Sequence, residues 1–133
     1  MNIRIKFIHI VLIVSVSSAL SCAASKSKSA VEEFHRLYND GKYTDIYAAS
    51  TPSFRVKISE PAFVTLLSNT TKRLGSYKSS ATYNINTTSI DWTVSEVELV
   101  YESDFATGTA TERFVFTMIN RKPVLSDFAI TIK

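Results

Sequence analysis

The period of the hydrophobic residues changes once along this chain, near Ser76. Before Ser76, apolar residues recur at intervals of three and four, which is the spacing of one face of a helix. After Ser76, they alternate with polar residues, as in strands that have one buried and one solvated face. Because the expected helices come first and the expected strands follow, the sequence predicts an α+β fold.

Two helices are expected at the start of this pattern. Residues 30–39 follow Ser29, an expected N-cap, and end before Gly41, which adopts the left-handed conformation easily. Residues 42–49 resume the helical spacing and end before Pro52, because proline disfavours helix in the residue before it.

A third helix is expected between Ser59 and Gly75. Ser59 is a suitable N-cap, Pro61 fits the first turn, and Gly75 is a suitable stop. Four strands are then expected at 77–88, 94–103, 109–119 and 124–132. The links between them are short enough for hairpins, so we expect N-terminal helices packed on a curved antiparallel sheet of about four strands.

The first 25 residues have the three zones of a secretory signal peptide. Arg4 and Lys6 are basic, residues 7–16 form an apolar run, and small residues follow. The run is shorter than the roughly 20 residues of a membrane span. The sequence therefore predicts export, and an N-terminal anchor helix that is retained is the alternative.

Cys22 is the single cysteine of the chain, which excludes an internal disulfide and a zinc site made of several cysteines. Ala19-Leu20-Ser21-Cys22 resembles a bacterial lipobox, in which the cysteine is acylated and becomes the new N-terminus. Ordinary cleavage after Ala23 or Ala24 is the alternative. The predicted organisation is a signal peptide at 1–21, a lipid attachment site at Cys22, a mobile polar tether at 22–29 and one domain at 30–133.

The charge balance depends on this processing. The chain has 15 Lys and Arg against 12 Asp and Glu, and Arg4 and Lys6 leave with the signal peptide. A nearly neutral domain gives no reason to expect nucleic acid or strong membrane-surface binding. Contact with a membrane is therefore expected only through a lipid anchor on Cys22.

Short motifs in a fixed order resemble the bacterial exported family called domain of unknown function 4019. The resemblance covers about Val31 to Ile132. Its motifs are Leu37-Tyr38-Asn39-Asp40-Gly41-Lys42-Tyr43, Ser53-Phe54-Arg55, Leu74-Gly75-Ser76, Tyr101-Glu102-Ser103-Asp104-Phe105 and Thr111-Glu112.

This resemblance implies export and a cystatin-like cone of the group that is similar to nuclear transport factor 2. The family has no established catalytic residues, so none is carried over to this chain. The sequence departs from the family at Tyr47, where the family often has Trp, and at 120–123, where an Asp-Gly-Lys-Trp type of turn is common.

Few residues offer chemistry. His35 is the one histidine outside the signal peptide, and a general base would need a positioned partner, so no catalytic residue is assigned. Glu96, Glu98 and Glu102 share one strand face, which favours a solvated surface over a metal site because a straight row does not converge on an ion. Aromatic rings are candidates for lining a cavity inside the cone: Tyr38, Tyr43, Tyr47, Tyr83, Trp92 and Tyr101.

The sequence therefore predicts an exported cell-envelope protein, soluble in the periplasm or lipid-anchored. We expect a non-enzymatic domain, without a cofactor or a metal, that binds an envelope protein or a small apolar ligand. The alternatives are a small isomerase or hydrolase that uses the cone cavity, and a purely structural envelope lipoprotein. Dimerisation through the open face of the sheet is a further possibility.

Overall fold

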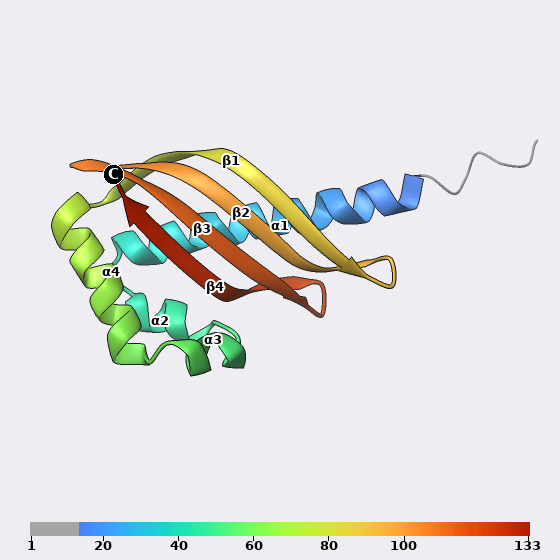
Figure 1. Ribbon diagram of the computed structural model, residues 1–133, viewed down its shortest axis with the longest axis horizontal. Helices are drawn as coiled ribbons and strands as arrows, with labels where there is room; N and C mark the ends of the chain where they lie inside the picture. Colours follow the sequence, from blue (N-terminus) through green and yellow to red (C-terminus); the bar gives the residue numbers. More distant parts are fainter. Residues whose placement is uncertain (1–13) are drawn as a thin grey trace, which may run out of the picture.

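The structure is a computed structural model that describes residues 14–133 and has four helices followed by four strands (Figure 1). The elements are α1 (Val14–Asn39), α2 (Tyr43–Ala48), α3 (Pro52–Lys57), α4 (Glu60–Leu74), β1 (Tyr77–Ile90), β2 (Thr93–Phe105), β3 (Gly108–Ile119) and β4 (Lys122–Ile132). This order confirms the predicted α+β class. Arg4, Lys6 and most of the apolar run lie outside the described residues.

The four strands form one open, curved sheet in the order β1-β2-β3-β4, and every neighbouring pair is antiparallel. Each pair is joined by a two-residue turn, at 91–92, 106–107 and 120–121. Because hairpins alternate in direction, the first and third turns lie at one end of the sheet and the second at the other. We call these the tip end and the closed end.

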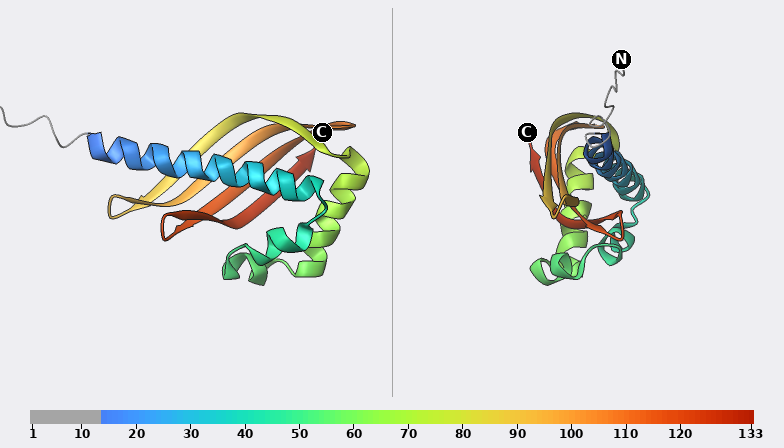
Figure 2. Two further views of the ribbon diagram at one scale, coloured as in Figure 1. Left: turned by 180° about the vertical axis from the view of Figure 1, so that it is seen from behind. Right: turned by 90° about the vertical axis from the view of Figure 1, so that its right-hand side faces the viewer.

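Helix α1 runs along the inner face of the sheet, and α2 to α4 gather at the closed end (Figures 1 and 2). The alternation of the strands sets the core, with Val97 and Leu99 of β2 facing Phe116 and Phe114 of β3 on the inner face. All four side chains are buried against α1 and its neighbours. Burial of this apolar stripe is the main force that holds the helices on the sheet.

The segment predicted as a polar tether, 22–29, is part of α1, and Ser29 lies inside the helix instead of capping it. Ala23 is 6% exposed and Ser27 is fully buried, in the same helical phase as Val31. The small side chains at this spacing let the helix lie close to the sheet. Their size also explains the wrong prediction, because they contribute too little apolar area to mark a buried face.

Pro52 has a second role that the sequence prediction missed. It ends the α2 segment as expected, but it is also the first residue of α3, a position where proline's fixed φ favours a helix. Thr51 caps this short helix by accepting a hydrogen bond from the Phe54 amide. The predicted caps of α4 are confirmed: Ser59 accepts from the Ala62 amide, and Gly75 has a φ of 74°.

Candidate functional site

A buried polar cluster lies between α1 and the sheet. His35 Nε2 is hydrogen-bonded to Glu112 Oε2 at 2.8 Å, and Ser103 Oγ donates to the same oxygen at 2.6 Å. The three residues are 3%, 2% and 1% exposed, respectively. The His35 ring also stacks on Tyr77, with centroids 3.6 Å apart and planes 6° apart.

The register of the sheet explains why Glu112 is inside. It occupies an inner-face position of β3, in line with Ala110 and Phe114, and stands opposite Tyr101 of β2. A lone buried carboxylate is unfavourable in an apolar core unless it is hydrogen-bonded. His35 and Ser103 supply those bonds, so the cluster satisfies a polar group that the strand alternation forces inward.

The geometry of this cluster does not fit nucleophilic catalysis. A serine hydrolase needs its hydroxyl bonded to the histidine and the carboxylate behind the histidine. Here the carboxylate is in the middle, and Ser103 is bonded to Glu112 instead of His35. Two grooves lie on the described surface, of about 600 and 160 Å³, and none of the three residues lines either of them. We therefore interpret the cluster as a structural contact inside the protein.

Four of the six aromatic residues proposed for a cavity pack into the body of the protein instead. Tyr38, Tyr47 and Tyr101 are buried, and Tyr43 is half-buried. The Tyr38 hydroxyl donates to the Gly75 carbonyl at 3.0 Å, and the Tyr47 hydroxyl donates to the Ile58 carbonyl at 2.9 Å. Burial raises the pKa of both Tyr38 and Tyr101, which keeps these hydroxyls neutral.

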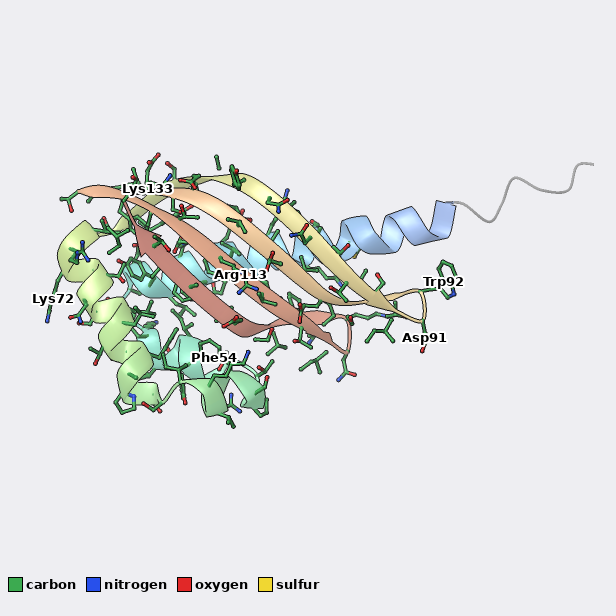
Figure 3. All side chains as sticks on the ribbon, in the orientation of Figure 1. Phe54, Lys72, Asp91, Trp92, Arg113 and Lys133 are labelled. Carbon is green, nitrogen blue, oxygen red and sulfur yellow. The ribbon has the colours of Figure 1, made fainter. Side chains whose placement is uncertain are left out.

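The other two aromatic residues lie at the surface. Tyr83 is 76% exposed in the middle of β1, and Trp92 is 87% exposed in the turn between β1 and β2 (Figure 3). Trp92 borders the groove of about 600 Å³, whereas Tyr83 borders neither of the two grooves. The six rings therefore do not surround a common cavity.

The larger groove, with a volume of about 600 Å³, lies at the tip end between α1 and two of the turns. We call it the tip groove. Its lining residues are Cys22, Ala23, Lys26, Trp92, Thr93, Val94, Met118, Asn120 and Arg121. Cys22 is exposed there, and Lys26 Nζ donates to the Arg121 carbonyl at 3.1 Å, which links α1 to the β3–β4 turn.

The chemistry of the tip groove is apolar and cationic. Trp92, Val94 and Met118 provide apolar surface, whereas Lys26 and Arg121 provide positive charge. The lining includes no carboxylate and no histidine. Such a site suits a ligand with an apolar body and an acidic group.

The outer face of the sheet holds ion pairs that join different strands, and one of them involves the C-terminal residue that follows β4. Arg113 bonds to Glu98 at 2.6 Å and to Asp127 at 3.0 Å, and Lys133 pairs with Glu102 (Figure 3). A hydrogen bond from Asn86, together with Arg113, lowers the pKa of Glu98. This face is therefore a paired, solvated surface.

Residues 14–133 contain neither a membrane-spanning helix nor a cluster of metal ligands. In this part of the chain, no helix is long and apolar enough to cross a membrane. In the same residues, His, Cys, Asp and Glu side chains do not gather in groups of three that would hold a metal ion.

No model of a known protein family matches the chain, and a search of curated proteins finds no match. The resemblance to domain of unknown function 4019 therefore stays a prediction from the motifs quoted above.

Proposed function

We propose that this chain is an exported binding domain of the bacterial cell envelope, anchored at Cys22, which holds an acidic amphiphile in the tip groove without catalysing a reaction. The observation that carries the proposal is the division of chemistry between two places. The groups of catalytic type, His35, Ser103 and Glu112, are buried in the core. The charged residues that line the accessible groove, Lys26 and Arg121, are both cationic, and they lie beside apolar residues and the neutral polar residues Thr93 and Asn120.

The position of Ala23 supports a lipoprotein type of cleavage. Ala23 is 6% exposed and belongs to the hydrophobic core. Cleavage before Cys22 keeps this core residue, whereas ordinary cleavage after Ala23 or Ala24 removes it. A cysteine at the new N-terminus is also exposed at the groove, where an acylating enzyme can reach it.

The charge of the groove supports an acidic ligand. Lys26 of α1 donates a hydrogen bond to the backbone carbonyl of Arg121 in the β3–β4 turn. Two positively charged residues from different parts of the chain therefore line the same groove. The apolar side chains beside them offer a surface for a hydrocarbon body. The second groove, about 160 Å³, is smaller and contains Glu33, so it suits such a ligand less well.

Native mass spectrometry of the full chain, purified from bacterial membranes, tests this proposal. We expect a polypeptide that begins at Cys22 and carries acyl chains, together with a retained anionic amphiphile. The variant Met118→Lys, which places a charge in the groove, should lose the amphiphile and keep the acyl chains. The matched control is Val56→Lys, because Val56 is 87% exposed on α3 and does not line the groove.

Two results would contradict the proposal. An unmodified N-terminus at Ala24 or Ser25 would exclude the lipid anchor. A tip groove that is empty in the purified protein, and stays empty in both the unaltered chain and Val56→Lys when laurate is added, would exclude the acidic amphiphile.

A further inference from the structure

Three large apolar side chains are exposed together at the tip end. Trp92 is 87% exposed, Ile90 is 64% exposed and Ile119 is 44% exposed, and all three lie in or beside the two turns. Side chains of this size are usually buried, and a local group of them on the surface marks an interaction site. Trp92 points away from the sheet at this end (Figure 3).

Positive charge accompanies these side chains. Lys26, Arg121 and Lys122 are all exposed at the tip end, whereas Asp91 is the acidic residue of the two turns. We define the tip surface as the six residues Lys26, Ile90, Trp92, Ile119, Arg121 and Lys122. A surface that combines a tryptophan, aliphatic residues and cations complements the boundary between anionic lipid headgroups and acyl chains.

The backbone conformation of both turns indicates that Trp92 and Arg121 do not stabilise the fold at their positions. Asp91 and Trp92 have φ values of 49° and 64°, and Asn120 and Arg121 have 51° and 63°. Two positive φ values are typical of a type I′ turn, whose second position favours glycine. Trp92 and Arg121 occupy that position in the two turns, where a side chain adds strain.

The course of α1 identifies what lies beyond this surface. The helix begins at the tip end, extends past the turns and continues toward the closed end (Figures 1 and 2). In the sequence, the apolar run of 7–16 leads into this helix and overlaps its first residues, and Cys22 lines the tip groove. Any attachment of the chain to a membrane therefore starts from the same end as the tip surface.

We propose that the tip surface docks on an anionic lipid bilayer, with Trp92 at the depth of the headgroups and Arg121 and Lys122 against lipid phosphates. This inference rests on the proposed anchorage near Cys22, but it adds a second contact that fixes the orientation of the domain. Acyl chains on Cys22 hold one point of the domain at the membrane, and basic residues that face anionic headgroups add to this attachment.

Trp92 is the single tryptophan of the chain, so its fluorescence tests the docking directly. The full chain is reconstituted in phosphatidylcholine vesicles with or without phosphatidylglycerol, and the vesicles are floated to recover the bound protein. With anionic lipid, we expect the Trp92 emission to shift to shorter wavelength and to be quenched by brominated acyl chains. The double variant R121S/K122S should lower the ratio of docked to undocked protein about fivefold for each lost charge.

Two controls use exposed residues of the same chain. Lys72→Ser removes a positive charge from α4, far from the tip end, and should leave the quenching unchanged (Figure 3). In the variant W92F/Y83W, the reporter moves to the middle of β1, where brominated lipid should not quench it.

Several outcomes would overturn the inference. Protein that floats with the vesicles while Trp92 remains as accessible to acrylamide as free indole would refute docking and leave the anchorage intact. Protein that does not float with anionic vesicles would refute it as well. A blue shift that appears without vesicles and grows with protein concentration would show that the tip surface binds a second copy of the chain instead.

Discussion

The closed end and the tip end of the sheet are made of the same four strands, but they bury their side chains very differently. At the closed end, the helices cover the inner face and even a carboxylate, Glu112, is 2% exposed. At the tip end, a tryptophan is 87% exposed in a turn. The two ends of the sheet therefore have different roles. The closed end contributes buried contacts that stabilise the fold, and the tip end presents exposed side chains to the solvent.

The difference also bears on the question of catalysis. The closed end has a histidine and a serine bonded to one carboxylate, and all three side chains are buried. The tip end has access, but its groove lacks a carboxylate or a histidine. The groups of catalytic type and the accessible groove therefore lie at different ends of the molecule.

The largest expected effect comes from breaking the buried cluster of the closed end. Glu112→Ala leaves His35 and Ser103 without their shared partner and should lower the free energy of unfolding by about 3–5 kcal/mol. Urea denaturation followed by circular dichroism measures it. The control is Glu96→Ala, an exposed carboxylate on the neighbouring strand, which should change the free energy by less than about 0.5 kcal/mol. Equal losses for the two variants would mean that Glu112 does not hold the cluster together.

Two glycines sharpen the comparison within the helical layer. Both residues have a positive φ, 74° at Gly75 and 70° at Gly41. A Cβ added at Gly75 would lie 2.9 Å from the Ala106 Cβ, which is too close. A Cβ added at Gly41 would have no atom within 4 Å. Gly75→Ala should therefore cost up to about 3 kcal/mol and Gly41→Ala about 1 kcal/mol, measured by thermal unfolding. Equal costs would mean that the contact between α4 and the β2–β3 turn relaxes freely.

The outer face should make a smaller contribution that depends on pH. The pKa of Glu98 is lowered in the folded protein, so its stabilising effect is present above the ordinary carboxyl pKa and is lost as the pH falls through the folded value. Because the pair with Arg113 is partly solvated, the effect should be below about 1 kcal/mol. Glu98→Gln should flatten the acid side of the stability curve, and Glu96→Gln should not. A curve that Glu98→Gln leaves unaltered would contradict this.

The smallest expected effect is an increase in stability at the tip end. Trp92→Gly relieves a positive φ but makes the unfolded chain more flexible, so the free energy of unfolding should rise by at most about 1 kcal/mol. Differential scanning calorimetry measures it. A clear loss of stability would show that the Trp92 ring packs into the fold, and the contrast between the two ends would then be wrong.

The strand pattern was predictable because each alternation is local to one strand. The partner of His35 was not, since Glu112 is 77 positions away and meets it only through the packing of α1 on β3. A signal was present, because Glu112 interrupts the apolar alternation of Ala110, Phe114 and Phe116. An acidic residue on a buried face predicts a partner but not which residue that partner is.

The tip groove was harder to predict. Trp92 was expected inside a cavity because its aromatic ring suggested burial, but the turn at 91–92 carries it outward. The contribution of α1 to the groove was hidden as well, because 22–29 looked like a tether and its buried residues are small. Both errors concern the three-dimensional position of a helix or a hairpin turn relative to the rest of the fold. The local sequence pattern does not determine that position.

The unbroken course of α1 has a mechanical consequence. If the chain is held at Cys22, a force on that point acts along the helix axis, and the helix lies lengthwise on the sheet. Such a load must shear the whole length of the contact at once, including Phe34 against Phe114 and His35 against Glu112, instead of peeling it apart one residue at a time. A flexible linker in place of the helix would not load this contact in the same way, so an anchor at Cys22 would pull on the domain through its most extensive helix–sheet contact.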